Sequence, residues 1–391
     1  AGAQVMFVNP VDYEFLFEVH AKAIVPPAQL AATLAGIAAC YPDAANHKTA
    51  AVKAAISNAS PDETQRGIAA ALKNAEQGTV LLGGVALSHP QYSLIRALAE
   101  VIADNSGAVL GMLPNAANSA GGWLAGVLPH RGPGGSDVSA PGLGARDMLE
   151  TPFQAYLLLN VEPGHDCFDA APATAAIEAA EFVVSISPFA SESIRSAADV
   201  LLPIGPFTET SGTFVNAEGR WQSFAGVASP LGDSRPGWKV LRVLGNQFGL
   251  DGFDQDNPEE IRDALREQCG KIKMDNHQAA GPVANAVETG GLERVGDVAI
   301  YSVDSLVRRA VSLQATPDAE VAGLLRINPK QAETSGVLDG YRVRISQGDA
   351  SVEMDVRIDE RVADGCVWVQ SGTAASVALG AAFGPVTVER V

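Results

Sequence analysis

The stretch from Ala155 to Ile204 decides the fold, because an apolar run recurs three times in it with helix-like segments between. Ala155–Val161 reads AYLLLNV, Phe182–Ser187 reads FVVSIS and Asp199–Ile204 reads DVLLPI. These runs are apolar throughout rather than alternating, as expected of strands covered on both faces in a parallel sheet. We therefore predict a parallel β-sheet with helices packed against it.

The same alternation of strands and helices extends from the first residue to about residue 250. Tyr92–Ala103 places its large apolar side chains on one helical face, and Trp238–Phe248 has a similar pattern. Three further apolar runs predict strands, at Gln4–Asn9, Thr79–Val85 and Ala108–Leu113. Such alternation predicts a doubly wound α/β fold.

The last seventy or so residues have a different pattern. Tyr341–Ser346 and Val352–Ile358 alternate apolar with polar residues, which is typical of half-buried strands. Cys366–Val369 and Val386–Val388 predict two more strands. One short helix is framed by an N-cap, a proline and a terminal glycine, at Asn328, Pro329 and Gly336. We predict a small β-barrel here.

A chain of 391 residues is too long for one compact core, so several domains are expected. We predict an α/β region of two lobes at residues 1–270, a linker at 271–320 and the barrel at 321–391. The linker carries one expected helix near Val303–Leu313. A strand that begins at the first residue, without Met, suggests that the chain was cut out of a longer one.

The charge and the cysteines exclude several classes of function. The net charge is −18, from 27 basic and 45 acidic side chains, which argues against binding to nucleic acid or anionic lipid. No run approaches the roughly 20 apolar residues that cross a bilayer, and the first residues have no signal-peptide pattern. The scattered cysteines predict free thiols rather than disulfides or metal ligands, at Cys40, Cys167, Cys269 and Cys366.

The familiar catalytic motifs for phosphate binding, dinucleotide binding, zinc proteases and serine hydrolases do not occur. Gly83-Gly84 follows a strand and could admit a ligand, but a lone glycine pair is a weak signal and we interpret it as close helix packing. His165-Asp166-Cys167 groups possible metal ligands at the end of a strand, where open α/β sheets bind ligands. Three adjacent side chains cannot all face one ion, so we interpret it as an ordinary surface loop.

The densest polar stretch is Phe207–Gln222, which reads FTETSGTFVNAEGRWQ and follows the last predicted strand of the sheet. By composition it could hydrogen-bond a polar cofactor, or it could satisfy its own backbone in a turn. Composition does not decide between these two interpretations.

The same stretch resembles a loop of molybdopterin-type oxidoreductases and of the large iron–sulfur subunit of respiratory complex I, NADH:quinone oxidoreductase. Ala197–Pro203 resembles the strand that precedes this loop in the family, and residues 325–340 resemble the closing β-barrel. The fold implied is a pair of molybdopterin oxidoreductase-type α/β lobes with a small C-terminal β-barrel. The Asn118–Gly122 loop and the short barrel look closer to the complex I branch.

The complex I resemblance implies a structural part of that subunit, without catalytic, cofactor-binding or metal-binding residues of its own. It implies that the [2Fe-2S] and [4Fe-4S] clusters are bound upstream of Ala1, and that no cofactor is held in this segment. The partners would be other peripheral-arm subunits of complex I, on the cytoplasmic side of the inner membrane, with no nucleic acid and no direct membrane contact.

Two rivals stay open. The first is the pterin-binding body of a molybdenum or tungsten oxidoreductase such as a formate dehydrogenase. In that case the expected contacts to the pterin are Asn160, Ser185, Glu209, Thr213 and Asn216. The second is a free-standing α/β module that binds a small anionic ligand.

Overall fold

The computed structural model describes residues 2–151, 153–270, 272, 282–283 and 290–391. Contacts within the chain divide it into two units. The first contains residues 1–113, 276–300 and 315–391, and the second contains residues 114–275 and 301–314. Residues 301–314, expected in a linker, therefore contact the second unit although their flanks belong to the first. Within the described ranges, no helix is long and apolar enough to cross a bilayer.

The first unit begins with an α/β portion. Strands β1 (Met6–Asn9) and β2 (Ala21–Ile24) pair in parallel, as do β3 (Thr79–Leu82) and β4 (Val109–Met112). The helices are α1 (Leu30–Ala39), α2 (Ala50–Ser57), α3 (Glu63–Asn74), α4 (Gly84–Leu87) and α5 (Tyr92–Ser106). Parallel pairing needs a crossover connection, and helices α4 and α5 supply the one between β3 and β4, whereas residues 10–20 join β1 to β2 without a helix.

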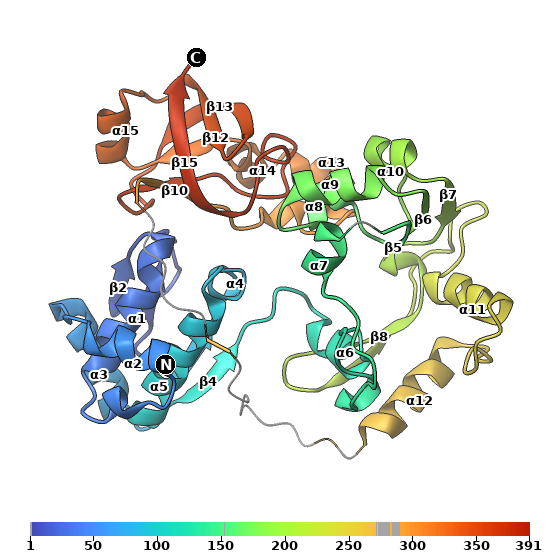
Figure 1. Cartoon of the computed structure of the whole chain (residues 1–391), viewed down its shortest axis with the longest axis horizontal. Coiled ribbons are helices and arrows are strands. Elements are labelled where there is room, and N and C mark those ends of the chain that lie inside the picture. Colours follow the sequence, from blue (N-terminus) through green and yellow to red (C-terminus); the bar gives the residue numbers. More distant parts are fainter. Residues whose placement is uncertain (1, 152, 271, 273–281, 284–289) are drawn as a thin grey trace. The chain divides into compact units, whose positions relative to one another are not determined.

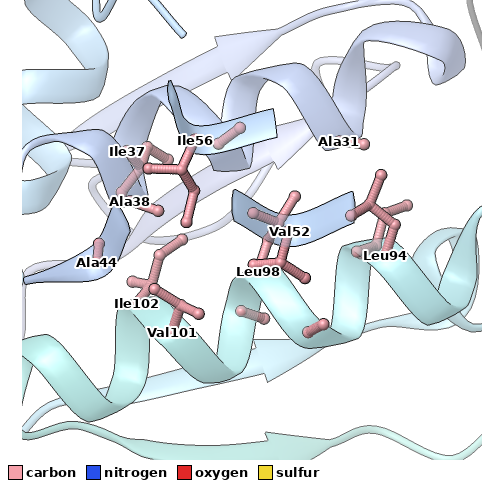
Figure 2. Close-up of a cluster of buried hydrophobic side chains, with 14 of the residues drawn as sticks. Ala31, Ile37, Ala38, Ala44, Val52, Ile56, Leu94, Leu98, Val101 and Ile102 are labelled. Atoms are coloured by element: carbon pink, nitrogen blue, oxygen red, sulfur yellow. The ribbon is translucent and has the colours of Figure 1, made fainter. Parts of the chain in front are cut away.

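Helix α5 confirms the amphipathic pattern predicted for Tyr92–Ala103. Leu94, Leu98 and Ile102 recur at helical spacing and are buried, and the helix ends at Gly107, whose φ of 79° suits a left-handed cap. Figure 2 shows these side chains facing residues of α1 and α2, among them Ile37 and Val52. Burial of this cluster holds the helices of the α/β portion together.

The C-terminal part of the first unit is a closed barrel, as predicted (Figure 1). Its strand order is β10-β14-β11-β13-β12-β15. The strands are β10 (Leu292–Val295), β11 (Leu325–Ile327), β12 (Arg342–Gln347), β13 (Ala350–Ile358), β14 (Cys366–Trp368) and β15 (Phe383–Arg390). Strand β10 falls in the predicted linker, so the barrel draws on residues before 321.

Two helices accompany the barrel, α14 (Pro317–Ala322) and α15 (Pro329–Ser335). Helix α15 confirms the predicted short helix. Asn328 caps it by accepting a hydrogen bond from the backbone N–H of Lys330 at 3.0 Å, and Gly336 ends it with a φ of 66°.

The second unit is built around a parallel sheet of order β5-β6-β7, formed by β5 (Ala155–Leu159), β6 (Phe182–Ser187) and β7 (Val200–Pro203). These strands confirm the prediction of three strands from the apolar runs of this region. A hairpin, β8 (Gly212–Val215) and β9 (Trp221–Phe224), follows the sheet. The helices are α6 (Ser119–Leu124), α7 (Ala145–Glu150), α8 (Pro163–Asp166), α9 (Ala170–Glu178), α10 (Glu192–Ala197), α11 (Gly237–Gln247), α12 (Pro258–Cys269) and α13 (Val311–Gln314).

The expectation that these strands are covered on both faces is wrong for one face of β5. Alternate residues of a strand point to opposite faces, and Leu157 and Leu159 are 58% and 45% exposed. Phe182 pairs with Ala155 and is exposed on the same face. Ile186, the partner of Leu159 in β6, lies on this face and is fully buried, so the face is exposed along β5 and at Phe182 but covered at Ile186.

The segment predicted as a linker has more structure than expected. In place of one helix at Val303–Leu313, a 3-10 turn at Val307–Arg309 is followed by the short helix α13. Most of the polar stretch 275–291 lies outside the described residues.

Candidate functional site

The carboxyl ends of β5, β6 and β7 lie at one edge of their sheet because the three strands are parallel. Open α/β sheets bind their ligands at this edge. Asn160, the residue after β5, has a φ of 51°, and it is the one non-glycine residue with positive φ in the described part of the chain. A left-handed residue at a strand end marks a sharp change of chain direction, which Asn tolerates better than most residues.

Glu162, two residues further on, is a buried carboxylate with two cationic partners. It is 1% exposed. Arg308 donates to its Oε2 from Nη2 at 2.7 Å and from Nε at 3.2 Å. Arg309 donates from Nη2 to Oε1 at 2.5 Å and from Nη1 to Oε2 at 3.1 Å. Both oxygens of Glu162 are therefore occupied by guanidinium groups.

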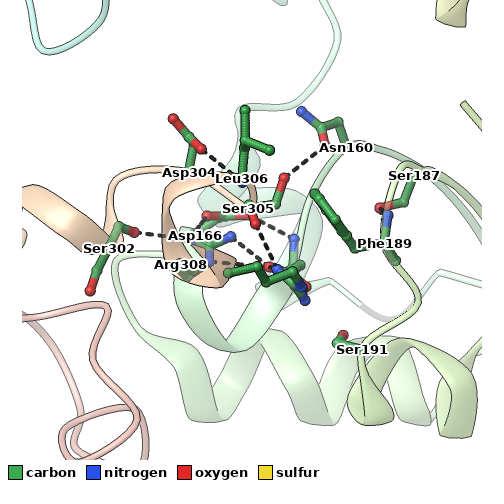
Figure 3. A network of polar contacts seen from close by, with 12 residues as sticks. Asn160, Asp166, Ser187, Phe189, Ser191, Ser302, Asp304, Ser305, Leu306 and Arg308 are labelled. Carbon is green, nitrogen blue, oxygen red and sulfur yellow. Dashed lines mark hydrogen bonds and ion pairs between the residues drawn. The ribbon is translucent and has the colours of Figure 1, made fainter. Parts of the chain in front are cut away.

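Asp166 balances the second positive charge. Its Oδ1 accepts from Arg308 Nη1 at 2.9 Å, and its Oδ2 accepts from the backbone N–H of Glu162 at 2.7 Å. Two carboxylates thus face two guanidinium groups, which is the arrangement that makes burial of charge tolerable. Figure 3 shows Asp166 and Arg308 in this network.

The network shifts the pKa values of its members. Burial alone would raise the pKa of Glu162, but the hydrogen bonds and charges of Arg309 and Arg308 lower it overall. Burial opposes the positive charge of Arg308, yet Asp166 and Glu162 raise its pKa overall. Glu162 is therefore ionised at neutral pH and acts as an acceptor of hydrogen bonds.

Residues 301–314 carry both arginines to the sheet, and we call this segment the strap. The guanidinium of Arg309 lies over the ring of Phe189, which follows β6, at 4.5 Å from the ring centre. Ser305 Oγ donates to Asn160 Oδ1 at 3.5 Å. Asp304 accepts from the backbone N–H groups of Leu306 and Val307, which fixes the turn that presents the arginines. The strap thus contacts residues that follow both β5 and β6.

Of the five contacts expected for a pterin, Asn160 is the one that joins this network. Ser185 lies within β6 and is fully buried, and its hydroxyl has no hydrogen-bond partner among the described residues. Glu209 ends a 3-10 turn, Phe207–Glu209, after β7.

Thr213 and Asn216 make their hydrogen bonds within the β8–β9 hairpin. The Thr213 hydroxyl bonds that of Ser223 on the opposite strand at 2.9 Å. Asn216 Oδ1 accepts from the backbone N–H groups of Glu218 and Arg220, at 3.0 and 2.9 Å. For Asn216 the geometry matches the turn interpretation, in which the loop satisfies its own backbone.

The sequence did not single out Glu162, Arg308 or Arg309. The available signal was the Arg308-Arg309 pair, because two adjacent cations with apolar residues around them require acidic partners. What could not be read from the chain was the partner, since Glu162 lies 146 residues before Arg308.

The other predicted groups have different surroundings. Asp166 belongs to the charge network, whereas a search of the described residues finds no group of three His, Cys, Asp or Glu side chains that could hold a metal ion. All four cysteines are free. A Cβ at Gly83 would meet nothing within 4 Å, so close packing does not explain that glycine.

The Asn118–Gly122 loop forms the start of helix α6. Asn118 Oδ1 accepts a hydrogen bond from the backbone N–H of Val215 at 2.8 Å. A Cβ on Gly121 would collide with the same Asn118 side chain. This loop therefore has a structural role, because it ties α6 to the β8–β9 hairpin.

Comparison with known families gives this arrangement its context. Residues 62–247 match the family Molybdopterin oxidoreductase, and residues 305–390 match the Molydopterin dinucleotide binding domain. These two segments of the chain are similar to molybdopterin oxidoreductase domains. Acetylene hydratase from Pelobacter acetylenicus has a similar fold, with a TM-score of 0.66 and 12% identity over 95% of this chain and 67% of that one.

Curated relatives lie in two groups of oxidoreductases. A subunit of the NADH-quinone oxidoreductase of Mycobacterium bovis is 27% identical over 309 residues, which is 70% of this chain and 37% of the relative. A putative formate dehydrogenase of Staphylococcus aureus strain USA300 is 39% identical over 91 residues, 23% of this chain and 9% of the relative. The chain thus spans well under half the length of each relative.

The expectation of no cofactor in this segment is wrong. The molybdopterin oxidoreductase and dinucleotide-binding domains lie within it and point to a pterin cofactor. The side chains at the edge of the β5–β7 sheet fit such a group. Asn160 is an acceptor for a ring N–H group, Arg309 is a partly exposed cation for phosphate, and Phe189 is a flat apolar surface, while Glu162 holds Arg309 in place.

Proposed function

We propose that this chain is the pterin-binding part of the large subunit of an NADH-quinone oxidoreductase, and that it serves electron transfer from NADH to quinone. The observation that carries the proposal is the 309-residue match to a subunit of such an enzyme, which runs through 70% of the chain. The matches to the two molybdopterin domain families support a pterin cofactor in this part of the subunit.

The residues at the edge of the β5–β7 sheet would hold the group. Asn160 would accept a hydrogen bond from its rings, and Arg309, positioned by Glu162, would offset the negative charge of its phosphates. When bound, a pterin of this type supplies sulfur ligands to molybdenum or tungsten. The chain's own part is to bind, orient and shield that group.

Electron transfer through iron–sulfur clusters would take place outside this chain. Iron–sulfur clusters would be bound by the preceding part of the large subunit, and the acidic surface of this chain would face peripheral-arm partners on the cytoplasmic side of the membrane.

A second candidate is the cofactor-binding body of a formate dehydrogenase, which the 39% identity over 91 residues favours. The full-length protein, purified with its partners, separates the two. We expect it to support reduction of quinone by NADH and not reduction of an artificial acceptor by formate. Formate-dependent turnover without NADH-dependent turnover would replace the first candidate with the second.

A further inference from the structure

The connection between β1 and β2 carries an exposed apolar loop. Residues 14–18 read EFLFE, and all five are exposed. Phe15 is 36% exposed, Phe17 is 51% exposed and Leu16 is fully exposed. Single exposed apolar side chains are common on protein surfaces, but three consecutive large ones favour contact with another apolar surface. We call residues 14–18 the FLF loop.

A cluster of aromatic rings holds the FLF loop against the rest of the first unit. The ring of Phe15 stacks on that of Phe7 in β1 with 4.3 Å between centres, and Phe17 stacks on Phe15 at 5.1 Å. Tyr13 packs edge-on against Phe15 at 6.5 Å and against Trp368 at 5.6 Å. The five rings therefore form one continuous cluster, from Trp368 in the barrel to the exposed Phe17.

Backbone hydrogen bonds and an ion pair fix both ends of the loop. The N–H of Asp12 donates to the carbonyl of Arg361 at 2.7 Å, and the N–H of His20 donates to the carbonyl of Val5 at 2.8 Å. Lys22 in β2 forms an ion pair with Asp12 at 2.6 Å. Because the loop is ordered by its own chain, a partner does not have to order it, and less free energy is lost on association.

Acidic side chains flank the apolar residues on both sides. Glu14 and Glu18 are exposed, and neither forms an ion pair with another described residue. Glu14 interacts with the charge of Arg361, but that guanidinium is hydrogen-bonded to Asp359 at 2.7 Å. The chain also has a net charge of −18, so a second copy and an anionic membrane would both be repelled. An apolar groove bordered by Lys and Arg complements both the apolar and the acidic residues.

We propose that the FLF loop is a docking element that inserts Leu16 and Phe17 into an apolar groove with a basic rim on a different polypeptide of the same assembly. Glu14 and Glu18 pair with Lys or Arg side chains of that rim. Large apolar side chains at the centre and charges at the edge are the usual arrangement of a protein–protein interface. The inference goes beyond the proposed function and does not depend on a bound pterin.

The first test identifies what Leu16 contacts. The photoreactive amino acid p-benzoylphenylalanine replaces Leu16 in the full-length protein, which is purified with its partners and irradiated, and mass spectrometry locates the attached residue. We expect attachment to a different polypeptide, at an apolar residue that lies close to Lys or Arg in the sequence of that partner. Attachment to another part of the same chain, to a second copy or to lipid, or no attachment at all, would overturn the proposal.

The second test measures how strongly Leu16 holds the partner. Leu16 is fully exposed, so Leu16→Asp is expected to leave the melting temperature of the 391-residue chain within about 1 °C of the wild type. In the full-length protein the same change is expected to weaken association with the cross-linked partner about tenfold. Leu231→Asp is the matched control, because Leu231 is 84% exposed and lies outside the loop, and it should change neither value. Unchanged association in Leu16→Asp would contradict the proposal.

Reversal of the flanking charges tests the basic rim separately. The double variant Glu14→Lys with Glu18→Lys is expected to weaken association at low salt, and its difference from the wild type should shrink as the NaCl concentration rises, because salt screens exposed charges. A double variant that binds as tightly as the wild type at low salt would show that the rim is not basic. Pterin content is measured in the same samples: partner loss in Leu16→Asp from protein without pterin supports the docking element and removes the proposed function, whereas pterin-containing protein whose association ignores Leu16→Asp does the reverse.

Discussion

Tyr13 donates a hydrogen bond from its hydroxyl to Oδ2 of Asp297 at 3.3 Å, across 284 residues of sequence. Trp368 and Gln370 donate to the same carboxylate, at 2.5 and 3.2 Å. A backbone bridge between Val11 and Val362 lies nearby in the sequence. These bonds connect the residues that follow β1 to the barrel. The N-terminal α/β portion and the barrel of the first unit therefore share the hydrogen-bond network around Asp297.

We predict that Asp297→Ala destabilises the first unit by about 3 kcal/mol, because three donors lose their acceptor at once. Urea unfolding followed by circular dichroism measures the loss, and hydrogen exchange should show faster exchange in β10 and β14. The exposed Asp349→Ala serves as the matched control and should stay within about 0.5 kcal/mol of the wild type. A similar small effect at Asp297 would show that its hydrogen bonds contribute little.

His89 makes the first unit sensitive to acid. Its ring is buried, Nδ1 accepts from the backbone N–H of Gln91 at 3.0 Å, and Nε2 therefore donates to the carbonyl of Pro27 at 3.0 Å. Burial lowers the pKa of His89, although the bond to Pro27 works in the opposite direction. The unfolded chain thus binds the proton more readily than the folded chain does.

The sign of the pH effect follows from that difference. Stability from neutral His89 is fully present above about pH 6.5, the ordinary pKa of histidine, and is lost as the pH falls towards the lowered pKa of the folded state. We expect the melting temperature to fall less between pH 7 and pH 5 in His89→Gln than in the wild type. The exposed His130→Gln serves as the control. If the melting temperature of His89→Gln falls between pH 7 and pH 5 as much as that of the wild type, His89 is not the source of the acid sensitivity.

Glu162→Ala should destabilise the second unit by about 3–5 kcal/mol, because it leaves the buried guanidinium of Arg308 with a single carboxylate partner, Asp166. Arg309→Ala should cost only about 1 kcal/mol, since its side chain is one-third exposed and Arg308 still neutralises Glu162. Urea unfolding monitored by the fluorescence of Trp123, Trp221 and Trp238 compares the two variants. Equal losses would mean that Arg309 contributes as much to stability as the whole Glu162 network, against this prediction.

The lowered pKa of Glu162 makes a separate prediction about acid. The charged form is stabilised in the folded state, so its contribution is present above the ordinary glutamate pKa of about 4.3 and disappears as the pH falls through the lowered value. The difference in unfolding free energy between wild type and Glu162→Gln should therefore shrink as the pH falls below about 4. A difference that stays constant down to about pH 2 would argue against an ionised Glu162.

Asn118→Ala removes the acceptor of the Val215 backbone N–H and should cost about 1–2 kcal/mol. Asn118→Asp keeps an oxygen at the same position and should retain most of that stability. Hydrogen exchange at Val215 checks both variants. Protection of Val215 in Asn118→Ala equal to that in the wild type would show that another group replaces the side chain.

The sequence could predict features that depend on local pattern. The apolar runs at β5, β6 and β7, the alternating strands of the barrel and the capped helix α15 all follow from side chains within a few positions of each other. The exposure of Leu157 and Leu159 was not predictable, because an apolar run does not indicate which face of the strand other elements of the fold will cover.

The candidate site was less predictable because it depends on contacts over long separations. Asn160 was named as a pterin contact only under the molybdenum-enzyme alternative, and its partner Ser305 is 145 residues away. Asn216 had two possible roles by composition, and only the positions of the Glu218 and Arg220 N–H groups favour the turn. The pterin cofactor was excluded on a resemblance to one branch of the family, and the domain matches overturned that judgement.

The most direct test of the account is the pterin content of the full-length protein, purified from its native host under anaerobic conditions. Acid release and oxidation turn a bound pterin into a fluorescent product that chromatography quantifies against the protein. We predict pterin in stoichiometric amount in the wild type and a clear reduction in Glu162→Gln, with Asn118→Asp unchanged. Pterin at background level in wild-type protein that still reduces quinone with NADH would contradict the account.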